Sequence, residues 1–150
     1  MRRLAILLLA IWAPPVVRPL AAADAPLAVI AHPSHPERLS TADVARIFLR
    51  KRRFWPDGSP IVPLNREPGS DAREAFSHRV LGGDSARWAS YWNDAYFNGV
   101  FPPAVLSSSA AVKRYVASEP GAIGYVDPAD VDDTVRVVLE LRGSGAAPSR

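Results

Sequence analysis

The sequence predicts a single α/β domain in which a mixed central sheet is flanked by helices, and three observations lead to this fold class. Short apolar runs of strand length alternate with longer segments whose apolar residues recur at helical spacing. Gly and Pro separate these segments, as expected for turns between elements. The 150 residues include no Cys, so a hydrophobic core must hold the domain without disulfides or thiolate metal sites.

Residues 1–23 have the pattern of a secretory signal peptide. Two arginines precede an apolar run over residues 4–13, and small residues that suit a signal peptidase follow it. The run is about half of the ~20 residues that a membrane-spanning helix needs. We therefore expect cleavage after Ala23 or after Ala25 and a periplasmic location.

The charge argues against a nucleic-acid partner. The chain has 18 Lys and Arg against 15 Asp and Glu, but three of the arginines lie in the predicted signal. The rest is nearly neutral, without the basic excess that nucleic-acid binding requires. Residues 26–141 have the usual length of one domain, and residues 142–150 have the composition of a flexible tail.

Four short apolar runs are predicted as strands, and the second contains a proline, Pro63, which indicates an edge or strand-end position. These strands cover residues 27–31, 61–65, 122–126 and 134–139.

Four segments with helical periodicity are predicted as helices, each preceded by a residue that can cap it. They cover residues 41–50, 70–81, 84–95 and 109–118. The third helix carries an aromatic row that we expect to pack on the sheet as core: Trp88, Tyr91, Trp92 and Ala95. In the fourth helix, Val112, Tyr115 and Val116 are expected to point inward.

Residues 66–73 form a candidate anion site, because they join a strand end to a helix start, where backbone N–H groups point outward. A seryl hydroxyl and two amides could donate to an oxyanion, and two arginines could clamp it. The alternative is an ordinary N-cap and turn with solvated arginines. The candidate ligand-binding residues are Arg66, Gly69, Ser70, Asp71, Ala72 and Arg73.

Four ordered blocks resemble the second lobe of the phosphate-binding proteins of phosphate ABC transporters. They are the helix over residues 40–49, Trp55-x-Asp57-Gly58-x-Pro60-Ile61, Arg66-x-x-Gly69-Ser70, and residues 120–126. The resemblance implies one lobe of a type II periplasmic-binding-protein-like fold. It also implies a solute-binding protein for inorganic phosphate or a related oxyanion, with Ser70 and the following amides as donors and Arg66 and Arg73 as counter-charges.

Two departures from the family point to weaker binding. The family's turn continues Gly-Ser-Gly-Thr, whereas this chain has Asp71 and Ala72 in the last two places. A carboxylate ~4 Å from an anion repels it by roughly 1 to 4 kcal/mol. The chain also has sequence for one lobe, so the site would be open to water. The alternative function is therefore an envelope interaction or sensory domain that docks a membrane sensor or transporter component. A homodimer that closes the cleft also stays open.

The remaining features indicate neither an enzyme nor a metal or cofactor site. His32, His35 and His78 are too scattered, with a proline between the first two, to predict metal ligands. No catalytic motif is recognisable. The basic run Arg50–Arg53 ends a helix, where cations complement the dipole; beside Phe54 it could instead contact anionic headgroups or an acidic partner.

Overall fold

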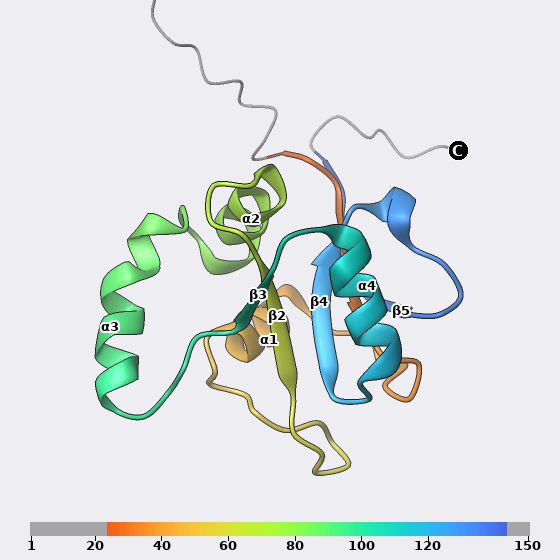
Figure 1. Ribbon diagram of the computed structural model, residues 1–150, viewed down its shortest axis with the longest axis horizontal. Coiled ribbons are helices and arrows are strands. Elements are labelled where there is room, and N and C mark those ends of the chain that lie inside the picture. Colours follow the sequence, from red (N-terminus) through yellow and green to blue (C-terminus); the bar gives the residue numbers. More distant parts are fainter. Residues whose placement is uncertain (1–23, 144–150) are drawn as a thin grey trace, which may run out of the picture.

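The computed structural model describes residues 24–143, so the predicted signal peptide and most of the predicted tail lie outside the described residues. Five strands form one mixed sheet in the order β3-β2-β4-β1-β5 (Figure 1). Strand β2 is parallel to β3 and β4, while β1 is antiparallel to β4 and β5. The strands are β1 (Leu27–Ala31), β2 (Val62–Arg66), β3 (Ala104–Leu106), β4 (Ala122–Val126) and β5 (Arg136–Leu141). The predicted mixed α/β class is confirmed.

Helices cover both faces of this sheet. Helices α1 and α2 pack on one face and α4 packs on the other, while α3 stands away from the sheet beside β3 (Figure 1). The helices are α1 (Thr41–Phe48), α2 (Asp71–Phe76), the π-helix η2 (Ser77–Leu81), the 3₁₀-helix η3 (Ala86–Trp88), α3 (Ala89–Phe97), α4 (Ser109–Ser118) and the 3₁₀-helix η4 (Pro128–Asp130). Within residues 24–143, none is long and apolar enough to span a bilayer.

Strand β1 is apolar throughout because helices cover both faces of the sheet. Alternate side chains point to opposite faces of a sheet, and both faces are covered here. Leu27 and Val29 belong to the cluster with α1 and α2, whereas Ala28 and Ile30 belong to the cluster with α4. Each strand residue therefore contributes to one of two apolar layers.

A capping box starts α1 where the sequence predicts it. The Ser40 hydroxyl accepts from the Asp43 amide at 3.1 Å, and the Asp43 carboxylate accepts from the Ser40 amide at 3.2 Å. Hydrogen bonds from Ser40, then the hydrogen bond from Arg46, lower the pKa of Asp43 to about 2. The carboxylate thus stabilises the first turn of the helix.

Strand β3 is absent from the sequence prediction. Of the two positions that Pro63 indicated, the sheet edge is wrong for β2, whereas the strand end agrees with its place as the second residue of β2. Three residues after two prolines give too short a pattern to recognise Ala104–Leu106 as a strand. This strand covers the outer side of β2, which therefore lies inside the sheet. Its pairing with β2 runs from Leu64 to Arg66, just beyond Pro63, so the missing N–H of the proline faces no β3 residue in that ladder.

The expected packing of the third and fourth helices is wrong in two respects. Helix α3 buries none of its residues, because its loop connections hold it beside the sheet edge and not over a sheet face (Figure 1). Tyr115 of α4 is 41% exposed, whereas Val112 and Val116 are fully buried as predicted. The aromatic row of α3 is therefore not core.

Candidate functional site

The candidate site lies at the edge where three parallel strands end. Strands β2, β3 and β4 end at Arg66, Leu106 and Val126, and their parallel register brings these ends together. Helix α2 starts at this edge after Ser70, and α4 starts there after Ser108. Two helix N-termini therefore lie beside one another at the carboxyl edge of the sheet, which is the usual ligand position in open α/β sheets.

Arg66 connects β2 to the start of α4. Its guanidinium donates to the Ser109 hydroxyl oxygen at 2.9 Å and to the Ser107 carbonyl at 3.3 Å. Its Nε is buried and has no hydrogen-bond partner among the described residues. One N–H of a held guanidinium is thus left for an acceptor.

Arg73 lies in the first turn of α2 and is nine-tenths buried, with 9% of its surface exposed. Its Nη1 donates to the Arg66 carbonyl at 3.4 Å, and its buried Nε has no acceptor within residues 24–143. Burying a charged group costs free energy unless it is paired and hydrogen-bonded. Arg66 and Arg73 therefore each keep a buried Nε donor that no described residue accepts and that an anion could satisfy.

Ser70 is the N-cap of α2, in agreement with the alternative interpretation of residues 66–73 as an ordinary cap and turn. Its hydroxyl oxygen accepts from the Arg73 amide at 3.3 Å, and the hydroxyl donates to the Glu67 carbonyl at 2.8 Å. The turn before it needs Gly69, whose φ is +82°. The amides of Asp71 and Ala72 belong to the first turn, where a helix offers its N–H groups no internal acceptor. The cap and the proposed donor set therefore occupy the same turn.

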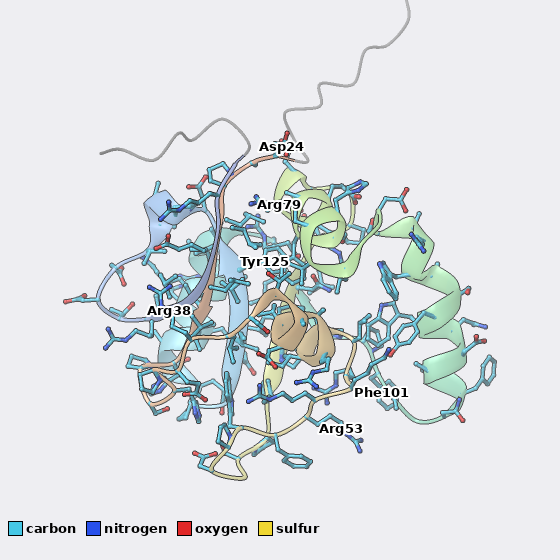
Figure 2. The ribbon with its side chains drawn as sticks, turned by 180° about the vertical axis from the view of Figure 1, so that it is seen from behind. Asp24, Arg38, Arg53, Arg79, Phe101 and Tyr125 are labelled. Atoms are coloured by element: carbon cyan, nitrogen blue, oxygen red, sulfur yellow. The ribbon has the colours of Figure 1, made fainter. Side chains whose placement is uncertain are left out.

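A buried tyrosine fixes the end of β2 and so the position of Arg66. The Tyr125 hydroxyl donates to Asn65 Oδ1 at 2.6 Å and accepts from the Arg66 amide at 3.1 Å. Its ring stacks on Phe76 of α2 with centroids 4.0 Å apart, near the centre of the molecule in Figure 2. Burial raises the pKa of Tyr125, although Arg66 and Arg73 oppose this, so the hydroxyl stays protonated at neutral pH.

Glu74 balances part of the charge of Arg73. The carboxylate accepts from the Ser85 hydroxyl at 2.6 Å and from the Ser85 amide at 3.2 Å. Burial raises the pKa of Glu74, but the hydrogen bonds from Ser85 and Gly69 and the charge of Arg73 outweigh it, and the pKa is lowered. Glu74 is therefore ionised at neutral pH, and it ties the loop after η2 to helix α2.

The structure thus brings together all six predicted residues, with Asp71 exposed and Ala72 half-buried, and adds three that the sequence did not indicate. These are Asn65, Ser109 and Tyr125. Their positions at or just after strand ends are the signal that could have found them. Without β3, the serines that precede α4 could not be placed beside Arg66.

The two ends of the described segment, 24–143, lie close together, and Arg79 contacts both. Its guanidinium donates to the Ala25 carbonyl at 2.9 Å and to the Arg142 carbonyl. Figure 2 shows Asp24 and Arg79 together at one edge of the molecule. In Figure 1 the chain enters and leaves at the end where α2 lies.

Two surface grooves of the described residues lie away from the candidate site. These grooves, of about 400 and 450 Å³, lie between other segments, near β1 and β5 and near Pro33 and Arg38. Neither is lined by Arg66 or Arg73. Within residues 24–143, no three His, Asp or Glu side chains gather in a way that could hold a metal ion. The buried charge and its unpaired donors mark the site.

Residues 17–145 match a protein family described as a PBP superfamily domain. A Clostridium perfringens protein, described as a phosphate ABC transporter substrate-binding protein and solved with phosphate bound, is 27% identical, with a TM-score of 0.61 over 76% of this chain and 45% of that one. An ABC-type phosphate transport receptor from Vibrio cholerae is 18% identical, with a TM-score of 0.60 over 75% and 44%.

PstS from Borrelia burgdorferi is 16% identical, with a TM-score of 0.58 over 83% of this chain and 50% of that chain. The Vibrio cholerae and Borrelia burgdorferi structures, both below 25% identity, show a shared fold. The chain spans about half the length of the structures it matches.

Proposed function

Because the chain belongs to the PBP superfamily-domain family, we propose that it binds a tetrahedral oxyanion, with phosphate as the preferred ligand, at the carboxyl end of β2. The observation that carries the proposal is Arg73, which is nine-tenths buried beside Arg66 with an unpaired Nε on each guanidinium. The 27% identical structure with bound phosphate supports the choice of anion, and its description supports a binding role and not a catalytic one.

Phosphate binding uses three kinds of donor in this proposal. The guanidiniums of Arg66 and Arg73 supply charge, and the amides of Asp71 and Ala72 supply N–H groups at the helix start. The Ser70 hydroxyl rotates its proton from the Glu67 carbonyl to the anion, while its oxygen keeps the cap with Arg73. The Asp71 carboxylate accepts a hydrogen bond from the protonated oxygen of hydrogen phosphate, which favours phosphate over fully ionised sulfate.

Asp71 is exposed, so in this proposal water reaches the bound anion, and this limits the affinity. Water screens charged hydrogen bonds on an exposed surface far more than in a closed cleft. We therefore expect weaker binding than in a site enclosed on both sides. Export to the periplasm and association with an ABC-type transporter belong to the same proposal.

Calorimetric titration of the full chain with phosphate, sulfate, molybdate and tungstate tests the function. The discriminating variants are Ser70→Ala and Ser70→Asp. The first removes the cap and the donor, whereas the second keeps a good N-cap but places a carboxylate where the anion binds. Ser70→Asp should unfold at the same urea concentration as the parent chain and lose phosphate binding.

Arg73→Gln and the control Arg38→Gln complete the set. Arg38 is exposed and lies apart from this site (Figure 2). Removing a charge-assisted hydrogen bond worth about 1.5 to 3 kcal/mol should weaken phosphate binding roughly ten- to hundredfold in Arg73→Gln and leave it unchanged in Arg38→Gln. The proposal fails if no heat is released up to millimolar phosphate, or if Ser70→Asp binds as well as the parent.

A further inference from the structure

Helix α3 and the segment after it carry aromatic side chains that the fold leaves exposed. Tyr96 is 58% exposed, Phe97 is 79% exposed and Phe101 is 63% exposed. Tyr96 packs edge-on against Phe97 and Phe101, with ring centroids 6.2 and 5.4 Å apart. Contiguous exposed apolar surface of this kind marks an interaction site more often than single exposed residues do.

The basic run after α1 lies against this helix. The Tyr91 hydroxyl of α3 donates to the Leu49 carbonyl at 2.6 Å, and Lys51 Nζ lies 6.0 Å from the centre of the Tyr91 ring. Lys51 and Arg53 are exposed, and Phe54, which follows them, is 57% exposed. Cations and aromatic rings therefore share one region.

Strand register places Arg53 and the segment at Phe101 at the same edge of the sheet. The Ile61 amide donates to the Arg53 carbonyl at 2.9 Å, which places Arg53 at the amino end of β2. Because β3 is parallel to β2 with Leu64 opposite Ala104, the segment at Phe101 approaches β3 from the same end. Figure 2 shows Arg53 and Phe101 on the same side of the molecule. We call the exposed side chains here the aromatic–basic surface: Lys51, Arg53, Phe54, Tyr96, Phe97 and Phe101.

We propose that the aromatic–basic surface binds an anionic phospholipid membrane. Aromatic rings settle at the level of the lipid headgroups, and Lys and Arg are attracted to anionic lipids. The charges fit this partner: Lys51 and Arg53 are exposed cations, whereas the acidic residue of α3 is Asp94 alone. The projecting shape of α3 in Figure 1 suits insertion into a deformable surface.

A second copy of the chain fits this surface less well. A two-fold contact through it would bring Lys51 and Arg53 of both copies into one interface, and these like charges would repel. The surface lies at the amino ends of β2 and β3, and the phosphate site lies at their carboxyl ends. Membrane binding therefore leaves the anion site accessible, and the two proposals can fail separately.

Co-sedimentation of the full chain with lipid vesicles tests this inference. One vesicle type contains phosphatidylglycerol and phosphatidylcholine in equal parts, and the other contains phosphatidylcholine alone. The variants are Lys51→Gln with Arg53→Gln, and Phe97→Ser with Phe101→Ser. The matched controls on α4 are Arg114→Gln and Tyr115→Ser, since both residues are exposed on another side of the molecule. The parent chain and all variants contain residues 1–23, so differences in vesicle binding between them come from the substituted surface residues.

We expect the parent chain to prefer the anionic vesicles and to lose that preference as salt rises, because salt screens exposed charges. Each removed cation should lower partitioning about fivefold, and each removed ring about tenfold. The α4 variants should partition like the parent. Equal binding to both vesicle types overturns the proposal, and so does an equal loss in the α4 variants. Unchanged lipid binding, combined with a loss of dimer in sedimentation velocity for the aromatic variant, overturns it in favour of self-association.

Discussion

Replacing Tyr125 by Phe should weaken both the fold and the candidate site. The change removes one hydroxyl and leaves the ring that stacks on Phe76. Asn65, which is 5% exposed, then loses the donor at 2.6 Å, and the Arg66 amide loses its acceptor at 3.1 Å. The perturbation therefore acts where β2 presents Arg66.

The magnitude follows from these two lost hydrogen bonds. A buried polar group left without a partner costs about 1 to 3 kcal/mol, and water reaches the Arg66 amide more easily than Asn65 because Arg66 is only half-buried. We expect the free energy of unfolding to fall by about 2 to 3 kcal/mol. Phosphate binding should weaken as well, since the strand end that carries Arg66 loses its anchor.

Urea unfolding, followed by tryptophan fluorescence, measures the stability change. Tyr115→Phe on α4 is the control, because this tyrosine is 41% exposed and should change stability by less than about 0.5 kcal/mol. Asn65→Leu added to Tyr125→Phe makes both partners apolar, and it should recover about 1 to 2 kcal/mol. If Tyr125→Phe unfolds within 0.5 kcal/mol of the parent (roughly the scatter of neutral surface changes), the tyrosine does not anchor the strand.

Three further predictions test other parts of the structure. Gly124→Ala puts a Cβ 2.4 Å from Val112 Cγ1 and should cost about 1 to 3 kcal/mol in urea unfolding; Val112→Ala should relieve part of that cost, and simple additivity of the two changes would contradict the packing. Asp43→Asn should destabilise the chain most above about pH 4, because the folded pKa of about 2 lies below the ordinary 3.8; the difference from the parent should vanish as the pH falls towards 2, and a constant difference across acid titration would refute this. Phe76→Ala should cost about 3 to 5 kcal/mol, whereas Phe97→Ser should change stability by less than about 0.5 kcal/mol; comparable thermal shifts would mean that α3 packs on the core.

Local signals in the sequence were sufficient for most elements. The capping box of Ser40 and Asp43 fixed the start of α1, and the left-handed Gly82 ended the helical segment that begins at α2. The short apolar run of β1 predicted a strand, and all five of its residues are buried. These features depend on neighbours along the chain, so a single sequence can reveal them.

The candidate site was predicted in part for the same reason. The turn from Arg66 to Arg73 is continuous in sequence, and a strand end followed by Gly69 and a capping serine indicates free amides. Its supporting residues come from elsewhere in the chain. Tyr125 and Ser109 meet Arg66 across 59 and 43 positions, and no pattern within the turn refers to them.

The sequence by itself determined the α/β class and the order of its main helices and strands, and it predicted the turn that we propose as the anion site. Only the tertiary structure decided that α3 remains unburied, that β3 covers β2, and that Arg73 is nine-tenths buried. An aromatic row at helical spacing has the same pattern whether the helix packs on a sheet or stands beside it. Burial depends on which elements the connections bring together, and that is a property of the whole fold.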